Sequence, residues 1–520
     1  MISSPSSLQA SWLTPRKKAF LTGTLLLTGT GFLCRILGFF YRVFLSRTIG
    51  AEGLGIYNMV HPVFGICFSL CAGSLQTALS QYAAANLKKG RNAFYSALAA
   101  SLSLSLLLAF LVCRFDEPIA SRLLLEPRCA PYLPVIALSV PFAALHACIN
   151  GYYYGMQQSR IPAFSQVAEQ VIRMGAVFFI VNSWAESGRA ITVSLAVYGH
   201  LIGEAASALF CLLSLLFFPP KGEIKARTSF FLSSGFTPVF ENMAPLMSLA
   251  LPLMGSRLVL NLLGSAEAVW IPNRLAASGL SSQEAYSVYG ILTGMSLPFI
   301  YFPSAITNSV AVLLLPAASQ AQADGDAGRI SRLISMCLRY SCYMGILCIG
   351  IFSMFGLPLG LSVFHSEEAG RFMICLAWLC PFMYLASTLG SVLNGLGKTS
   401  VTFGLNVVSM LIRLGFVLFA IPLFGIRGYL WGLLASEIAL ALLDLLLLRQ
   451  FALFSWDCFD MLIKPVLFMA IAVGLYFFFA PLLSFGSSFP LFVETGIHIM
   501  VICAAYCGLL LLAHLARGKS

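Results

Sequence analysis

The chain has 520 residues, of which 59% are hydrophobic and 10% are charged. Soluble globular domains carry about 25% charged residues, so this composition excludes an ordinary soluble enzyme and indicates a polytopic membrane protein. The formal net charge is +11. No loop combines a basic stripe with interleaved aromatic residues, so a nucleic-acid partner is not expected.

Fourteen apolar runs along the chain are long enough to cross a bilayer, which requires roughly 20 residues per helix. They lie at about 20–46, 57–87, 92–114, 131–156, 162–184, 190–218, 245–272, 286–319, 329–357, 370–396, 401–423, 427–450, 460–483 and 490–515. The runs at 57–87 and 286–319 are long and contain prolines, which predicts kinks in both. The expected fold class is an all-α polytopic membrane protein with about 14 transmembrane helices.

The distribution of lysines predicts the orientation of these helices. All nine lysines fall in segments that share one side of the membrane if the spans alternate. Because positively charged loops are retained in the cytoplasm, that side is expected to be cytoplasmic and to hold both termini. Residues 1–19 are polar and lack a cleavage site after an apolar core, which indicates a cytoplasmic tail and not a signal peptide.

Landmark residues recur between the two halves of the chain at offsets of about 220 to 245 residues. The matching pairs are Gly199 and Gly432, Glu204 and Glu437, Asn150 and Asn394, Gly151 and Gly395, Arg173 and Arg413, and, more loosely, Arg35 and Arg257. We therefore expect spans 1 to 6 to repeat as spans 7 to 12, in two six-helix lobes related by a pseudo-twofold axis along the membrane normal.

This repeat predicts the domain organisation. The expected parts are a cytoplasmic tail 1–19, an N-lobe 20–220, a cytoplasmic linker 221–244, a C-lobe 245–450, a C-terminal helix pair 451–516 and a cytoplasmic C-terminus 517–520. Transporters built in this way bind substrate between the lobes. The helix pair outside the repeat either pads the bundle or lines a route for an apolar molecule. One chain contains both lobes, so a monomer would suffice.

The first span carries permanent positive charge where lipid is expected. Gly31, Arg35, Gly38 and Arg42 follow one another at steps of four, three and four, so they share one face of a helix. An arginine at the centre of a span costs from about 2.5 to more than 10 kcal/mol, and Arg35 is therefore expected to face protein or water. Arg42 lies nearer the end of the span, where it either lines the same cavity or reaches the interface.

Five further buried charges are candidates for cavity lining or ion coupling. They are Glu267, Glu204, Glu437, Arg173 and Arg413. In each half, the acid and the arginine of the repeat either pair with one another or couple transport to Na⁺, H⁺ or the membrane potential. Glu169 and Arg173 are one turn apart, so a local ion pair is an equal alternative there.

No enzyme signature is present in the sequence. It contains no GxxxxGK[ST], HExxH or GxSxG motif, so neither catalysis nor a bound cofactor is expected. The fifteen cysteines lie mostly inside predicted helices without CxxC or Cys/His spacing. They are interpreted as small buried hydrophobic residues, and no metal site or disulfide is expected.

Several stretches carry a family resemblance that extends over nearly the whole chain. They are the opening run LTGTLLLTGTGFLCRILGFFYRVFLSRTIGAEGLGIY, the LS that ends the second span, NGLGKT at the eleventh span, and LPLMGSRLVLNLLGSAEAVWIPNRL in the seventh. They resemble the stage V sporulation protein B group, the polysaccharide-biosynthesis branch of the multidrug/oligosaccharidyl-lipid/polysaccharide exporter superfamily. The chain is similar, more distantly, to the MurJ flippases. Glu267 departs from the pattern, because an aspartate is expected there.

This resemblance implies a flippase that moves an undecaprenyl-pyrophosphate-linked peptidoglycan or polysaccharide precursor across the bacterial cytoplasmic membrane by alternating access. Arg35 matches the first cavity arginine of the MurJ flippases, whereas Arg42 is one residue further along than their second. Together with Arg257 these side chains would hold the pyrophosphate through charge-assisted hydrogen bonds. The C-terminal helix pair would form a groove for the lipid tail.

Two other functions remain open from the sequence. A cation-coupled multidrug exporter of the same superfamily would use Glu267, Glu204 and Glu437 as cation or proton sites, but such exporters typically have twelve spans. A membrane glycosyltransferase usually needs a sizeable outer loop with acidic and basic residues, and the longest outer loop here, about 115–130, is short.

Overall fold

The computed structural model describes residues 15–86, 89–188, 191–220, 237–454, 457–479 and 490–517. The regular structure of these residues is entirely helical. Thirteen helices in the described part are long and apolar enough to cross a membrane. The expected fold class, an all-helical polytopic membrane protein, is confirmed.

The first two predicted spans form one continuous stretch of helix. The span Leu26–Ala85 covers 60 residues, about three times the length that one crossing requires. Its helix α1 (Pro15–Phe68) is interrupted at Gly50, where φ is 73° and ψ is −179°. Glycine adopts this backbone conformation without steric cost. The chain therefore turns at Gly50, and this stretch is long enough for two crossings, so the thirteen candidate helices are sufficient for the expected fourteen.

A π-helix interrupts each of the two long runs, although Pro62 itself lies inside the continuous helix α1. In the run 57–87, the π-helix η1 (Ser69–Gly73) separates α1 from α2 (Ser74–Ala85). The run 286–319 is broken more severely: the π-helix η5 (Ile291–Ser296) and the short α10 (Leu297–Tyr301) come before α11 (Ser304–Ala323). A π-helix widens the turn and redirects the chain, as does a proline that removes a backbone donor.

The ends of the predicted domains differ from the structure by a few residues. The helix α1 begins at Pro15, inside the predicted tail, and α8 begins at Thr237, inside the predicted linker. Arg517 still belongs to the last helix. Residues 1–14, 221–236 and 480–489, which hold the rest of the tail, most of the linker and the end of the thirteenth predicted span, lie outside the described residues.

The chain divides into two compact units whose boundaries cross the predicted lobes. Unit 1 comprises Met1–Tyr41 and Met59–Leu262, and unit 2 comprises Arg42–Asn58 and Leu263–Ser520. The predicted lobes follow the order of the chain, whereas the segment on both sides of Gly50 packs with the second half and most of α8 packs with the first.

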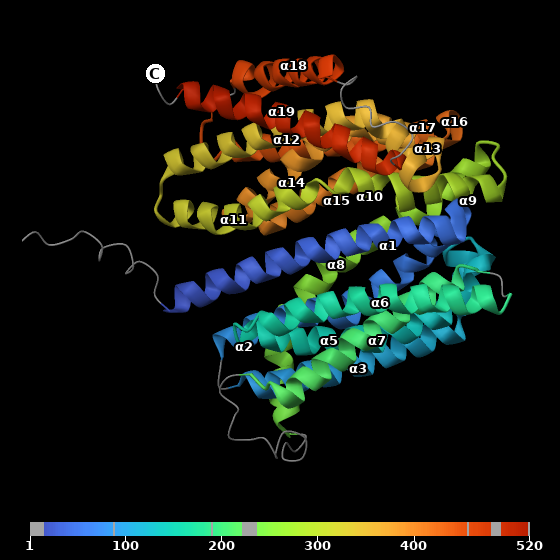
Figure 1. Ribbon diagram of the computed structural model, residues 1–520. Helices are drawn as coiled ribbons and strands as arrows, with labels where there is room; N and C mark the ends of the chain where they lie inside the picture. The colour runs from blue at the N-terminus through green and yellow to red at the C-terminus, as the bar shows by residue number, and fades with distance from the viewer. Residues whose placement is uncertain are drawn as a thin grey trace, which may run out of the picture. The chain divides into compact units, whose positions relative to one another are not determined.

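In unit 1, the helices α3, α5, α6 and α7 run alongside one another (Figure 1). The core between α2, α3 and α5 contains small side chains such as Ala78 and Ala97, which let the helices approach closely. Besides α1, η1 and α2, the elements of this unit are α3 (Gly90–Arg114), α4 (Asp116–Pro118), η2 (Ile119–Leu123), η3 (Pro127–Tyr132), α5 (Leu133–Gly155), α6 (Arg160–Glu186), α7 (Ser194–Phe217) and the first part of α8 (Thr237–Ala277).

In unit 2, the long helix α12 packs against α13, α14 and α19, and α15 packs against α17. One core of buried apolar residues joins α11, α12, α14 and α17. Besides η5, α10 and α11, the elements of this unit are α9 (Ser282–Gly290), α12 (Ala327–Phe364), α13 (Glu367–Leu376), η6 (Ala377–Leu379), α14 (Cys380–Gly395), α15 (Thr399–Phe419), α16 (Ile421–Phe424), α17 (Ile426–Leu448), η7 (Phe459–Ile463), α18 (Lys464–Phe479) and α19 (Leu491–Arg517).

The glycines of the sequence repeat have the same packing role in each unit. A Cβ atom on Gly151 would lie 2.7 Å from the carbonyl oxygen of Gln76 on α2, and one on Gly395 would overlap the backbone of Leu315 on α11. Each glycine thus lets the end of one helix touch the backbone of another. The repeat is therefore present in the internal packing of both units.

A helix crossing in unit 2 predicts a stability effect. A Cβ on Gly290 would overlap the carbonyl oxygen of Ala51 and lie 2.7 Å from the nitrogen of Gly55. Gly290→Ala should therefore lower the free energy of unfolding by about 1–3 kcal/mol through overpacking. The readout is the thermal unfolding midpoint of the detergent-solubilised protein.

The matched control is Gly404→Ala on α15, where no atom lies within 4 Å of the added methyl group. Because alanine favours a helix over glycine by up to about 1 kcal/mol, this variant should be unchanged or slightly stabilised. Equal midpoints for the two variants would show that the crossing at Gly290 is not tight.

Candidate functional site

Arg35 lies on the part of α1 that belongs to unit 1 and is exposed. It makes no hydrogen bond or ion pair with any described residue. A methyl group at Gly31 or Gly38, one turn before and after Arg35, would meet no atom of the described part of unit 1 within 4 Å. This face of α1 is therefore not packed against another helix of its own unit. None of the N–H donors of the Arg35 guanidinium is used by a described residue.

Arg42 and Arg47 belong to unit 2 and contact backbone carbonyls there. Arg42 Nη1 donates to the carbonyl oxygen of Thr293 over 3.4 Å, and its side chain is exposed. Arg47 donates from Nε to Val363 over 2.8 Å and from Nη2 to Ser362 over 2.9 Å. These carbonyls end α12, whose last turn has no helical partners for them. Arg47 thus caps α12, while Arg42 keeps most of its donors available.

Arg257 is half-buried on α8, within unit 1. Its Nη2 donates to Thr77 Oγ1 over 3.0 Å. The other terminal nitrogen, Nη1, lies 2.7 Å from the position that a Cβ on Gly73 would occupy. The bend at η1 therefore presents a glycine and a hydroxyl to this guanidinium, and Arg257 has a neutral partner and no carboxylate among the described residues.

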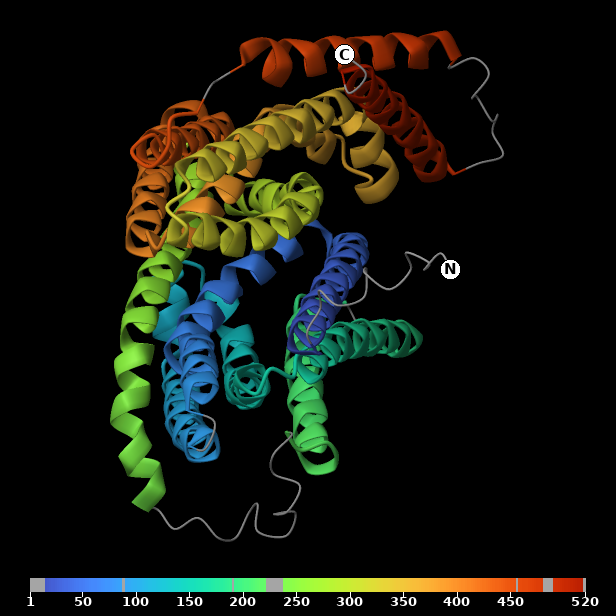
Figure 2. The same ribbon diagram turned by 90° about the vertical axis from the view of Figure 1, so that its left-hand side faces the viewer.

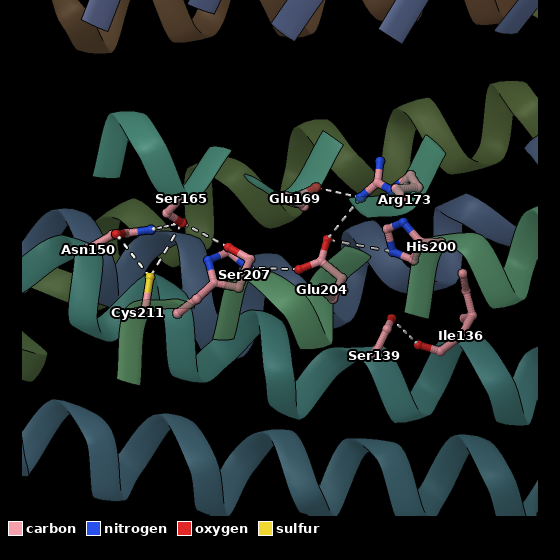
Figure 3. A network of polar contacts seen from close by, with 11 residues as sticks. Ile136, Ser139, Asn150, Ser165, Glu169, Arg173, His200, Glu204, Ser207 and Cys211 are labelled. Atoms are coloured by element: carbon pink, nitrogen blue, oxygen red, sulfur yellow. Dashed lines mark hydrogen bonds and ion pairs between the residues drawn. The ribbon is translucent and has the colours of Figure 1, made fainter. Parts of the chain in front are cut away.

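The predicted residues Arg173 and Glu204 meet in a buried polar network of unit 1 (Figure 3). Arg173 on α6 forms an ion pair with Glu169 on the same helix and lies 3.7 Å from Glu204 Oε1 on α7. His146 Nε2 on α5 lies 2.8 Å from Glu204 Oε2, and His200 Nε2 lies 3.9 Å from Glu204 Oε1. Glu204 is 6% exposed, and its partners lie on α5, on α6 and on its own helix α7. The alternative of pairing within one half is thus realised in unit 1.

A line of smaller polar groups continues this network along α5, α6 and α7. Ser165 and Ser207 share a hydrogen bond of 2.9 Å, Asn150 Nδ2 donates to Ser165 Oγ over 3.4 Å, and Cys211 Sγ donates to Asn150 Oδ1 over 3.4 Å (Figure 3). All four residues are buried. The repeat residue Asn150 therefore acts in helix packing through hydrogen bonds.

The network of unit 1 also has the side-chain types of a metal site. His146, Glu169 and Glu204 each present one ligand atom, and these atoms lie within 4.8 Å of one another. Arg173, however, contacts both carboxylates and supplies the positive charge that a metal ion would bring. The residues present therefore fit an internal ion-pair network better than a metal centre.

A second network in unit 2 joins two of the predicted residues by a different arrangement. Arg413 Nε on α15 lies 3.1 Å from Glu267 Oε2 on α8, and the Tyr429 hydroxyl on α17 donates to Glu267 Oε1 over 2.6 Å. Glu437, the repeat partner of Glu204, is half-buried and makes no ion pair with a described residue. The expected alternative of an Arg413–Glu437 pair is therefore wrong, because Arg413 forms its ion pair with Glu267 instead.

Three residues that contact the acids of these networks were not found from the sequence, namely His146, His200 and Tyr429. His146 lies one turn before Asn150, and Tyr429 lies one turn after Gly425 at the start of α17. Both are aromatic residues in apolar runs and show no distinctive spacing. The available signal was the position of His146 on the same helix face as Asn150, since residues four apart are neighbours on a helix.

This chain matches a known protein family over more than half of its length. The family described as "Polysaccharide biosynthesis protein" matches residues 20–322. The chain belongs to the polysaccharide biosynthesis protein family.

Two relatives from Bacillus subtilis are similar to this chain along most of their length. The stage V sporulation protein B of Bacillus subtilis (strain 168) is 29% identical over 434 residues, which cover 82% of this chain and 83% of that protein. The lipid II flippase MurJ of the same organism is 21% identical over 485 residues, which cover 87% of this chain and 86% of MurJ.

Two solved structures share the fold of this family member. An inward closed conformation of the lipid II flippase MurJ has a TM-score of 0.71 at 15% identity and covers 95% of this chain and 99% of that one. An inward-facing multidrug resistance transporter of the MATE family has a TM-score of 0.64 at 15% identity and covers 83% of this chain and 97% of that one.

The two networks predict that Arg173 and Arg413 are structural in this family member. Arg173→Gln leaves Glu169 and Glu204 buried and facing one another without a guanidinium, and Arg413→Gln removes the ion pair of Glu267. Breaking a buried pair costs about 3–5 kcal/mol, so both variants should unfold at a clearly lower temperature in detergent.

The matched control for this prediction is Arg35→Gln, which removes the same charge from a side chain with no ion pair among the described residues. Its unfolding midpoint should be unchanged or slightly raised. If it falls as far as that of Arg173→Gln, then Arg35 is also part of the packed structure.

Proposed function

We propose that this protein translocates an undecaprenyl-pyrophosphate-linked peptidoglycan or polysaccharide precursor across the cytoplasmic membrane by alternating access. The observation that supports this function is the exposed Arg35 on an unpacked face of a membrane helix in unit 1. A guanidinium is costly inside a bilayer unless water, protein or an anionic molecule faces it. The family and the name of the relative MurJ point to an anionic lipid as that molecule.

The chemistry of the three predicted arginines suits a pyrophosphate. A guanidinium presents several N–H donors in a plane and binds phosphate oxygens in a bidentate manner. Arg35 has all its donors available among the described residues, and Arg42 uses one donor in a long 3.4 Å contact. Arg257 shares one with Thr77. We assign the main contact to Arg35 and the supporting contacts to Arg42 and Arg257.

We further propose that a proton at His146 balances the charge of the unit 1 network. Two carboxylates, Glu169 and Glu204, face a single guanidinium there, which leaves one negative charge when both histidines are neutral. His146 lies on α5 and is faced by Glu204 and His200 from α7 and by the Glu169–Arg173 pair from α6. A proton on His146 makes this buried cluster neutral, so coupling to H⁺ is the ion coupling that we favour.

The alternative is a cation-coupled exporter of organic cations. Such a carrier needs carboxylates that can face the cavity, but Glu204 and Glu267 each already contact an arginine as an ion pair and an aromatic hydrogen-bonding group. Glu437 has no ion pair with a described residue and is the acid that would remain for this role.

The proposal predicts the transport defect of an Arg35 variant. In proteoliposomes, Arg35→Gln should slow the movement of a fluorescent undecaprenyl-pyrophosphoryl sugar at least about tenfold, because a hydrogen bond to a charged group contributes about 1.5–3 kcal/mol. The matched control is Arg329→Gln, which should transport normally; Arg329 is a half-buried arginine 3.5 Å from Asp324 near the start of α12.

The competing cargo in the same vesicles is an organic cation dye, tested also with Glu437→Gln. Transport of the dye alone, insensitive to Arg35 and lost in Glu437→Gln, would replace the flippase by an exporter of cations. Wild-type movement of the pyrophosphate lipid by Arg35→Gln would remove this arginine from the substrate site.

A further inference from the structure

A cavity of about 890 Å³ lies within unit 2 between α12, α18 and α19, and its lining includes none of the arginines proposed for transport. In Figure 2, α18 and α19 lie beside the long helix α12 at the C-terminal end of the chain. One side of the cavity is basic and carries Arg332, Arg339 and Lys464. The other side carries Leu510 and Leu511 of α19.

A buried acid fixes the basic side. Asp460 has a side chain that is 1% exposed, and it lies 3.1 Å from Arg339 Nε and accepts from Lys464 Nζ over 3.2 Å. Two cations thus share one carboxylate. The Arg339 side chain remains 48% exposed, so part of its guanidinium faces outward from this pair.

Arg332 adds a third positive charge to the cavity. Its side chain is 79% exposed, and its nearest acid, Asp326, is 4.0 Å away at the start of α12. Asp326 Oδ1 already accepts from the backbone nitrogen of Arg329 as the helix cap. The basic side therefore has more positive than negative charge and attracts an anion.

The cavity lies at one end of its three helices. Lys464 begins α18, Arg332 lies in the second turn of α12, and His514 of the cavity lies in the last turn of α19. Ser331 Oγ donates to the carbonyl oxygen of Leu453 over 2.8 Å, which places the loop after α17 beside it. Helix ends with several basic side chains are typical of the interface between lipid headgroups and water.

We propose that this cavity binds the phosphate headgroup of an anionic phospholipid from the surrounding bilayer. The phosphate would accept hydrogen bonds from Arg332 and from the outward side of Arg339, and Lys464 would add charge beneath it. The acyl chains would lie along the apolar surface of α19, where Leu511 is 63% exposed. This assignment does not depend on the transported substrate.

The amphipathic lining favours a phospholipid over a free phosphate ion. A free ion would use only the three cations, whereas Met336, Leu510 and Leu511 line the same cavity with no polar group to offer. A phospholipid fills both parts, because its headgroup needs charge and its chains need an apolar surface.

The test uses the full-length protein and native mass spectrometry of retained lipids. Wild type should retain phosphatidylglycerol in preference to phosphatidylcholine, and excess inorganic phosphate should not displace it. Arg332→Gln and Arg339→Gln should each weaken phosphatidylglycerol retention about fivefold, the factor expected for one cation beside an anionic lipid. Arg329→Gln removes a neighbouring charge that does not line the cavity and should retain phosphatidylglycerol as wild type does.

Three results would overturn the proposal: equal retention of phosphatidylglycerol and phosphatidylcholine, displacement by inorganic phosphate alone, or retention of polyprenyl pyrophosphate in place of phosphatidylglycerol. Equal loss in the Arg329 control would also overturn it, because the effect would then reflect net charge. Lys464 is not varied, because it remains as the cation beside Asp460 when Arg339 is replaced.

Discussion

The constraint on which the structure depends is that charge inside a bilayer must be neutralised close by. Both units meet it with a carboxylate held between an arginine and an aromatic hydrogen-bonding group. In unit 1, Glu204 lies between Arg173 and His146, and in unit 2, Glu267 lies between Arg413 and Tyr429. The arginines occupy equivalent positions of the repeat, but the acids do not. The same kind of interaction therefore occurs in both units. Its carboxylate comes from the sixth span of the repeat in unit 1 and from the first span of the repeat in unit 2.

Much of the fold was predictable because membrane helices leave a strong pattern in the sequence. Helix length for fourteen crossings, the interruption of the two long runs and the close helix contacts of the repeat glycines agree with the apolar length and small-residue spacing of the sequence. The continuity of the first two spans through Gly50 was not predictable, because a helix turn at glycine resembles a loop in sequence. The partner of Arg413 was also missed, since pairing across helices depends on which faces meet. The pseudo-twofold axis between the lobes stays a prediction.

Arginines that already pair with groups of their own unit are not available to bind a substrate. Arg173, Arg413 and Arg47 have carboxylate or carbonyl partners in their own units. Arg35 has none among the described residues and lies on an unpacked helix face. The sequence identified this residue by its depth in the span, and the structure distinguishes it from Arg173 and Arg413 by its exposure and by the absence of an ion pair with any described residue. The account of transport therefore assigns the substrate charge to a position that the fold itself does not need.

The measurement that tests this assignment most directly is a structure of the protein in lipid nanodiscs with an undecaprenyl-pyrophosphoryl sugar bound. The account predicts phosphate oxygens within hydrogen-bonding distance of the Arg35 guanidinium, about 3 Å, with the networks of Glu204 and Glu267 intact. A bound pyrophosphate that leaves Arg35 without contact, or that displaces Glu204 from Arg173, would contradict it.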